Sequence, residues 1–313
     1  MSKLAVLFPG QGSQSAGMLD DLAEGYPVVG ELLARASAVL GYDLADIIKN
    51  NPDEKLNQTE YTQPALLVAG VAAWSVLQQV ASPQPVFAAG HSLGEYTAMV
   101  CSGVLDFEAG VKLVQTRARF MQQAVPPGVG AMAAILGLDN DALKTICDEQ
   151  SQGQVVAPVN FNAPGQTVIA GNVDAVDRAI ASAKENGAKR AIKLAVSVPS
   201  HCALLLPAAE QMKSVLAEVS FSTAKFPVVH NVDVSVASSA EDYRRVLAEQ
   251  LYQPVRWTDT IEYLAAQGVD TLLELGPGKV LCGLNKRIDK TMKALPVFNQ
   301  VTLTKALEVL NGS

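Results

Sequence analysis

Short, wholly apolar runs alternate along this chain with longer stretches of helical periodicity, and this alternation constrains the fold more than any other feature. Leu4–Phe8 is such a run, and the turn-forming pair Pro9 and Gly10 ends it. Residues 85–89 form another, and residues 269–275 are apolar apart from Asp270, Thr271 and Glu274. Short apolar runs bounded by turn residues are typical of strands buried on both faces of a parallel sheet. Because helical patterns separate the runs, we predict parallel α/β layers.

Helical spacing of apolar residues is found between these runs. Apolar residues recur every three or four positions across residues 28–40, and residues 64–79 form a mostly apolar stretch of helical length. After residue 199 the alternation resumes, and we expect a strand at residues 227–232 and helices at residues 204–218, 240–251 and from residue 257 onward. These segments continue the same α/β layers.

The middle of the chain has a different order of elements, which begins after Pro126, Pro127 and Gly128. The pattern predicts strands at residues 130–136, 155–160, 167–170 and 191–196, and helices at residues 139–150 and 173–186. Turn-forming residues 162–165 separate the two central strands and indicate a hairpin. A β-α-β-β-α-β order is that of the ferredoxin-like unit. We therefore predict that residues 125–197 form a small ferredoxin-like α+β domain inserted into a larger domain.

Composition argues against several classes of protein. The formal net charge of −7 and the pI of about 5.1 disfavour a protein that neutralises nucleic-acid phosphates. Residues 65–74 are among the longest apolar runs, about half the roughly 20 residues that a membrane-spanning helix needs. We expect no secretory signal. The four cysteines are too far apart for a zinc site or a disulfide scaffold, so we expect a cytoplasmic protein without a metal.

Residues 90–94, GHSLG, match the G-x-S-x-G pattern of a nucleophile elbow and lie between a predicted strand and a predicted helix. The glycines permit a turn tight enough to expose the serine oxygen, and free N–H groups at the helix start can stabilise an oxyanion. With its parallel sheet and this elbow, the larger domain, residues 1–124 and 198–313, is predicted to be α/β-hydrolase-like. The alternative is an ordinary glycine-rich turn between a strand and a helix.

A serine nucleophile needs a base to take its proton, and the chain has three histidines. His91 adjoins Ser92 in the tight turn, so its side chain should diverge from the serine and line the pocket or support the turn. His201 lies in a turn before a predicted helix, and His230 lies near the carboxyl end of a buried strand. Either of these two can face a cleft beyond the strand ends. The alternative for each is a buried histidine that only forms structural hydrogen bonds.

Two glycine-rich loops do not match the nucleotide-binding motifs that they suggest. The loop at residues 8–14 lacks the third glycine of the dinucleotide fingerprint, and residues 276–279 lack the spacing of a P-loop. We expect the first loop to direct backbone N–H groups toward Ser92 instead.

Arg117 and Arg119 lie on different faces of a predicted helix that follows the elbow helix. One of them can enter the cleft and form a bidentate pair with a substrate carboxylate; the alternative is that both are solvated surface charges. Cys202 is a poor candidate for a nucleophile paired with the adjacent His201, because neighbouring side chains seldom face each other.

Four motifs together are similar to those of the bacterial malonyl-CoA:acyl carrier protein transacylases. They occur in the family's order and at its spacing, and they span nearly the whole chain: FPGQGSQ at residues 8–14, GHSLGEY at 90–96, PSHC at 199–202 and ELGPG at 274–278.

The resemblance implies roles for individual residues. Ser92 would be the acylated nucleophile and His201 its base. The backbone N–H groups of Gln11 and Leu93 would form the oxyanion hole, and Arg117 would form a salt bridge with the malonyl carboxylate. Gln250 would orient the histidine through its backbone carbonyl. Asn231 would help to orient the histidine or border it.

The resemblance also implies the reaction and the partners. The malonyl group would pass from malonyl-CoA to the phosphopantetheine thiol of acyl carrier protein, in a ping-pong reaction through malonyl-serine that supplies fatty-acid synthesis. We expect a monomer without a resident cofactor. Acyl carrier proteins are acidic, so a local basic patch must offset the net charge. The candidates for this patch are Lys189, Arg190, Lys286 and Arg287. The alternative is that they are ordinary solvated surface charges.

Two other functions remain open at this point. A serine hydrolase of the esterase or phospholipase kind would share the elbow and the base, and its carboxylate would lie between serine and histidine in the chain, in the stretch from Asp106 to Asp177. A non-catalytic acyl-CoA binding module would bind the thioester without releasing coenzyme A.

Overall fold

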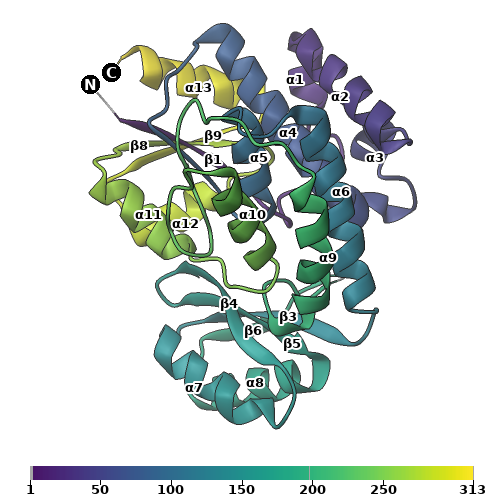
Figure 1. The fold of residues 1–313 in the computed structure, drawn as a ribbon. Helices are drawn as coiled ribbons and strands as arrows, with labels where there is room; N and C mark the ends of the chain where they lie inside the picture. The colour runs from purple at the N-terminus through teal and green to yellow at the C-terminus, as the bar shows by residue number, and fades with distance from the viewer. Residues whose placement is uncertain (1–2, 197, 313) are drawn as a thin grey trace.

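The protein contains two separate β-sheets, one parallel and one antiparallel, in a computed structural model that describes residues 3–196 and 198–312 (Figure 1). The larger sheet has five parallel strands in the order β7-β2-β1-β8-β9. They are β1 (Leu4–Phe8), β2 (Phe87–Gly90), β7 (Val228–Val229), β8 (Thr271–Leu275) and β9 (Lys293–Val297). The prediction of a mixed α/β fold with a parallel sheet is confirmed.

Side chains on both faces of the larger sheet are buried, which explains why its inner strands are mostly apolar. In β1, Leu4, Val6 and Phe8 belong to one core, whereas Ala5 and Leu7 belong to a second core on the other face. Successive side chains of a strand point to opposite faces. Each face therefore needs its own layer of helices.

The helices that pack against the larger sheet divide between these two cores. The first core includes residues of α1 (Asp20–Gly25), α2 (Pro27–Leu40), α3 (Leu44–Asn50), α4 (Thr59–Val80), α5 (Leu93–Cys101), α6 (Phe107–Ala124), α9 (Leu206–Ala217), α10 (Ala240–Glu249) and α13 (Gln300–Asn311). The second core includes residues of α11 (Trp257–Ala266) and α12 (Val280–Ile288). Two 3₁₀ turns, η1 (Pro52–Asn57) and η2 (Ala203–Leu205), complete the larger part.

The smaller sheet lies at the lower end of the view in Figure 1 and has four antiparallel strands in the order β4-β5-β3-β6. Its strands are β3 (Gly130–Leu136), β4 (Val156–Ala163), β5 (Gln166–Asn172) and β6 (Arg190–Lys193). Two helices, α7 (Asn140–Ser151) and α8 (Val173–Glu185), share an apolar core with this sheet. The predicted hairpin is β4 and β5, which a tight turn joins.

Two strands end earlier than the sequence predicts. β6 ends at Lys193 rather than at residue 196, because the chain leaves its partner β3 there, and Leu194, Ala195 and Val196 line a cavity instead. β7 has two residues, because the next segment bends back on itself and the N–H group of His230 donates to the carbonyl of Ser235.

The end of the predicted insert, residue 197, lies outside the described residues. The division into residues 1–124 plus 198–313 and residues 125–197 stays a prediction. In the described ranges, no helix combines the length and the apolar character that crossing a membrane requires.

Candidate active site

Ser92 occupies a strained turn between β2 and α5, with φ of 52° and ψ of −108°. The turn brings the chain so close to itself that a Cβ on Gly90 would lie 1.9 Å from the carbonyl carbon of Gly94. A Cβ on Gly94 would lie 2.0 Å from the carbonyl oxygen of Phe8. Only glycine fits at these two positions, which is the physical reason for the spacing of the G-x-S-x-G pattern.

His201 is the histidine that contacts the serine. Its Nε2 lies 2.7 Å from Ser92 Oγ, and its Nδ1 lies 2.7 Å from the backbone carbonyl oxygen of Gln250. Because a carbonyl can only accept, Nδ1 must carry the ring proton, which leaves Nε2 free to accept the serine proton. The backbone N–H group of His201 donates to the carbonyl of Leu251 and fixes the residue at a φ of 65°.

Burial, and secondarily the positive charge of Arg117, lower the pKa of His201 to about 3. The imidazole is therefore a neutral base at neutral pH. We expect kcat/KM for a reaction at Ser92 to stay flat between about pH 7 and about pH 5, because this quantity reports the pKa of groups in the free enzyme. A pH series in a constant ionic-strength buffer measures this. An acid limb centred near pH 6.5, the ordinary histidine value, would contradict the assignment.

Arg117 lies beside the serine, inside the protein. Its side chain is 1% exposed, and Nη2 lies 3.4 Å from Ser92 Oγ. Nη1 donates to Gln63 Oε1 at 2.9 Å and Nη2 to Gln250 Oε1 at 3.0 Å. Arg119, by contrast, is exposed and pairs with Glu60 at 2.8 Å. The structure thus places one of the two candidate arginines in the site and the other on the surface.

These side chains line a cavity of about 590 Å³ between the two sheets. Gln11 follows β1 and Ser92 follows β2, so both stand beyond the carboxyl ends of parallel strands, where α/β proteins place their ligand sites. Leu93 starts α5 beside them, and Met132 and Leu194 contribute from the side of the smaller sheet. Within the described residues, no group of three or more His, Cys, Asp or Glu side chains could hold a metal ion.

The other two histidines do not contact Ser92. The Nε2 of His91 lies 2.8 Å from Asn162 Oδ1. His230 is fully buried, and its Nδ1 lies 2.8 Å from Glu95 Oε1. Cys202 is buried too, and burial raises the pKa of its thiol to about 11, which does not suit a nucleophile.

Asn231, which was implied to orient or border the histidine, bonds to the elbow. Its Oδ1 accepts the backbone N–H of Ser92 at 2.7 Å and its Nδ2 donates to the carbonyl of Gly90 at 2.7 Å. Asn231 therefore holds the strained elbow in place. Sequence reasoning also missed Gln63 and Glu95, two buried polar residues that bond to the site. Polar residues in otherwise apolar helical stretches were the available signal.

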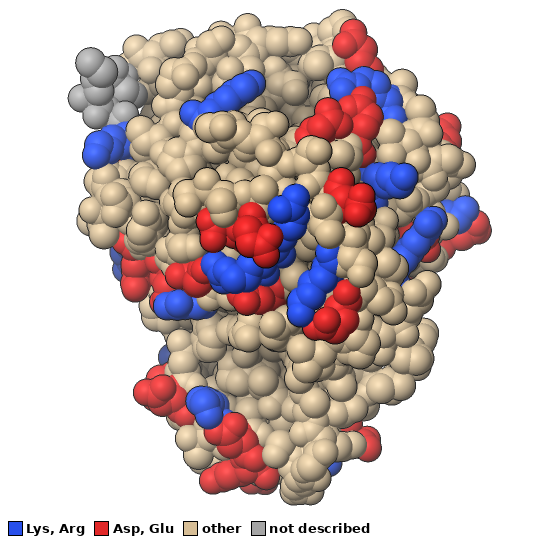
Figure 2. Space-filling view, in the orientation of Figure 1, with Lys and Arg blue, Asp and Glu red and all other residues tan. Residues whose placement is uncertain are grey.

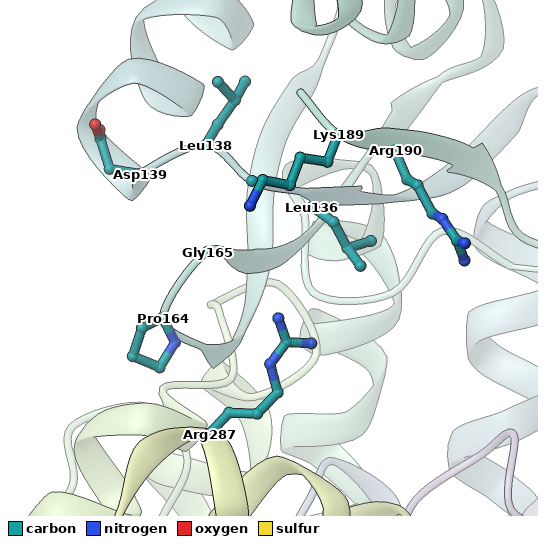
Figure 3. A pocket seen from close by; sticks show the side chains of 9 residues that line it. Leu136, Leu138, Asp139, Pro164, Gly165, Lys189, Arg190 and Arg287 are labelled. Atoms are coloured by element: carbon teal, nitrogen blue, oxygen red, sulfur yellow. The ribbon is translucent and has the colours of Figure 1, made fainter. Parts of the chain in front are cut away.

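A second cavity, of about 560 Å³, contains three of the four basic candidates, Lys189, Arg190 and Arg287. Figure 3 shows Lys189 and Arg287 approaching it from opposite sides, Arg287 from the last turn of α12. Lys286 is exposed on the same turn. The acidic Asp139 lies at the rim with its carboxylate turned away (Figure 3). On the face drawn in Figure 2, basic and acidic side chains intermingle.

Comparisons with known proteins show the family to which the chain belongs. The acyl transferase domain family matches residues 6–303. The malonyl CoA-acyl carrier protein transacylase of Escherichia coli strain K12 is 54% identical over 309 residues, which cover 99% of this chain and 100% of that protein. The protein of the same name from Bacillus subtilis strain 168 is 45% identical over 311 residues, which cover 99% and 98%.

Solved structures give the same result. A type II PKS acyl-carrier protein in complex with its malonyl-transacylase matches with a TM-score of 0.97 and 55% identity, over 98% of this chain and 100% of that chain. An acyl carrier protein S-malonyltransferase from Vibrio cholerae matches with a TM-score of 0.95 and 55% identity, over 97% and 100%. The resemblance inferred from the four sequence motifs is confirmed.

Proposed function

The chain belongs to the acyl transferase domain family, and on that premise we propose that it moves a malonyl group from malonyl-CoA to the phosphopantetheine thiol of acyl carrier protein. The transfer runs through a malonyl-Ser92 intermediate with ping-pong kinetics. Its product, malonyl-acyl carrier protein (malonyl carrier below), supplies fatty-acid synthesis. One observation carries this proposal most directly. Ser92 Oγ lies 2.7 Å from a neutral histidine base and 3.4 Å from a buried guanidinium that can bind the free carboxylate of a malonyl group.

The first half-reaction acylates the serine. His201 Nε2 takes the hydroxyl proton as Ser92 Oγ attacks the thioester carbonyl. The resulting oxyanion is stabilised by the backbone N–H groups of Leu93, at the start of α5, and Gln11. The tetrahedral intermediate then collapses, the carbon–sulfur bond breaks, and the imidazolium of His201 returns the proton to coenzyme A, which leaves as its thiol.

The second half-reaction uses the same groups in reverse. The pantetheine thiol of the carrier gives its proton to His201 and attacks the malonyl-serine ester, and the serine leaves as an alcohol after reprotonation. The backbone carbonyl of Gln250 holds the ring proton on Nδ1 in both halves, so no carboxylate partner is needed. Backbone groups, side chains and the substrate thioester supply all of the chemistry, and we propose no resident cofactor or metal.

Arg117 supplies the selectivity for a malonyl group. A guanidinium pairs with a carboxylate through two parallel hydrogen bonds, and it gains most when both are away from water. An acetyl group offers no carboxylate and leaves the buried cation without this partner. Neutral acyl groups should therefore be poor substrates.

Hydrolysis is the alternative reaction for the same elbow and base. An esterase-like triad would place a carboxylate on Nδ1 of His201, whereas the group found there is the carbonyl of Gln250. Incubation with malonyl-CoA, with and without holo carrier, tests the choice. Transfer predicts malonyl carrier as the main product and little free malonate, and rapid release of malonate in either incubation would refute it.

We propose the basic cavity as the docking site for the acidic carrier. Exchanging Lys189 and Arg287 together for glutamate should raise the KM for carrier at least about ten-fold, because rim charges act mainly on encounter and orientation. Transfer to a small thiol such as pantetheine should be unchanged. Lys112→Glu together with Lys305→Glu, the same total charge change on α6 and α13, is the matched control. An unaltered KM for carrier in the double variant would show that the carrier does not dock at this cavity.

Four finer points complete the proposal. The elbow at the carboxyl edge of a parallel sheet supports an α/β-hydrolase-like larger domain, and the β-α-β-β-α-β order supports a ferredoxin-like smaller one. We further propose a cytoplasmic location, where the substrates of fatty-acid synthesis are made, and a monomeric enzyme.

A further inference from the structure

The buried carboxylate of Glu95 lies in the first turn of α5, and the mechanism above does not use it. Its Oε1 lies 2.8 Å from Nδ1 of His230. Its Oε2 accepts the backbone N–H of Asn231 at 3.0 Å and the side-chain Nε2–H of Gln250 at 2.9 Å. The side chain is 0% exposed. Each oxygen thus faces hydrogen-bond donors, which suits an ionised carboxylate, since that group can only accept.

His230 does not neutralise this charge. The ring is 0% exposed, and its Nε2 has no hydrogen-bond partner. An imidazolium would leave a buried N–H group unsatisfied at that nitrogen, which is costly. A neutral ring with its proton on Nδ1 donates to Glu95 and leaves only an unprotonated nitrogen without a partner. The negative charge of Glu95 therefore needs another counter-charge.

Arg117 is the buried cation that lacks a direct partner of opposite sign. In residues 3–196 and 198–312, no carboxylate oxygen lies within salt-bridge distance of its guanidinium. One amide joins the two charges instead. Gln250 Oε1 accepts from Arg117 Nη2 at 3.0 Å, and Gln250 Nε2 donates to Glu95 Oε2 at 2.9 Å. Uncompensated buried charges are expensive, so this chain of contacts has an electrostatic purpose.

We propose that Glu95 is a specificity-determining positioning residue, which balances the charge of Arg117 across the Gln250 amide and keeps the guanidinium open for the carboxylate of the acyl substrate. A carboxylate in direct contact would occupy the guanidinium and compete with the substrate. The carboxylate of Glu95 is separated from the guanidinium by the Gln250 amide. From there it compensates the charge of Arg117 and holds the amide that orients Nη2. This inference rests on the proposed function, in which Arg117 binds the malonyl carboxylate.

Glu95→Gln removes the charge and keeps the shape. The new amide oxygen can still accept from Asn231 and Gln250. Its NH₂ group can donate to Nδ1 of His230 only when that ring carries its proton on Nε2, where it has no partner, so part of any fall in Tm comes from His230. The guanidinium, no longer balanced, should attract a substrate carboxylate more strongly. We expect the KM for malonyl-CoA to fall about ten-fold, while the KM for acetyl-CoA stays within about two-fold of wild type.

The matched control is Glu108→Gln, an exposed glutamate of α6 that pairs with Arg35, and we expect it to change neither KM. Equal changes of KM for both acyl donors in Glu95→Gln, or no change for malonyl-CoA, would reduce Glu95 to a structural residue and overturn the inference.

A cycle of thermal unfolding midpoints tests the same coupling without activity. Arg117→Ala and Glu95→Gln should each lower Tm, and the double variant should lose less than the sum of the two, because neither buried charge then stands alone. Strict additivity would overturn the inference. The cycle also separates it from the proposed function: if Arg117→Ala retained its preference for malonyl-CoA, the role of Arg117 would fail, while the coupling would still decide the role of Glu95.

Discussion

Replacing Ser92 by alanine should lower malonyl transfer to the carrier by at least about 10⁴-fold, because the residual rate then comes only from binding and the oxyanion donors. The variant should fold. Alanine fits the space of serine, and the elbow hydrogen bonds of Asn231 run to backbone groups, which the substitution leaves in place. The measurement is the initial rate of malonyl carrier formation at saturating malonyl-CoA, with circular dichroism to confirm the fold.

Ser182→Ala, a serine on α8, serves as the control and should keep a rate within about two-fold of wild type. A Ser92→Ala enzyme that still acylates the carrier at a comparable rate would mean that the thiol attacks malonyl-CoA directly. The ping-pong mechanism would then be wrong, whatever the geometry around His201.

Arg117→Ala should remove the preference for malonyl over acetyl groups. The lost pair is desolvated, since the side chain is 1% exposed, and breaking such a pair typically costs about 3–5 kcal/mol. We therefore expect kcat/KM for malonyl-CoA to fall about a thousand-fold and that for acetyl-CoA to change by less than about ten-fold. Steady-state kinetics with the two acyl donors and one carrier measure the ratio.

Arg119→Ala is the matched control, two positions along the same helix. Arg119 is exposed and pairs with Glu60, and exposed pairs contribute little, so its removal should leave the ratio unchanged. If Arg117→Ala kept the selectivity of the wild-type enzyme, Arg117 would not be the group that reads the malonyl carboxylate.

The larger sheet was predictable because burial on both faces makes its inner strands mostly apolar. β1 is apolar over its whole length, and β8 is buried over its whole length although it contains Thr271 and Glu274. β9 and α13 were not predicted. β9 is an edge strand with Lys293 and Pro296 in it and only Val297 fully buried, so the pattern of a buried strand is missing.

The elbow was predictable from the sequence, since two glycines at fixed spacing satisfy a purely local steric requirement. The choice between His201 and His230 was not, because the distances that decide it join residues far apart in the chain. Ser92 and His201 are separated by 109 positions. From the residues alone both histidines remained open, and only the family resemblance favoured one of them.

The network behind the elbow is a stronger case of the same limit. Glu95 and Gln250 are 155 positions apart, and neither belongs to a pattern that predicts their contact. Helical periodicity separates Arg117 from Arg119 by face, but it does not say which face meets the cavity. Packing of α6 against α4 and α9 decides this, and that packing depends on the whole fold.

The central claim is a covalent malonyl ester on Ser92, and intact-mass spectrometry after exposure to malonyl-CoA in the absence of carrier tests it most directly. The wild-type protein should gain the mass of one malonyl group, peptide mapping should place that group on Ser92, and addition of holo carrier should remove it. A protein whose mass stays unchanged while it still malonylates the carrier, or a malonyl group mapped to another residue, would contradict the account.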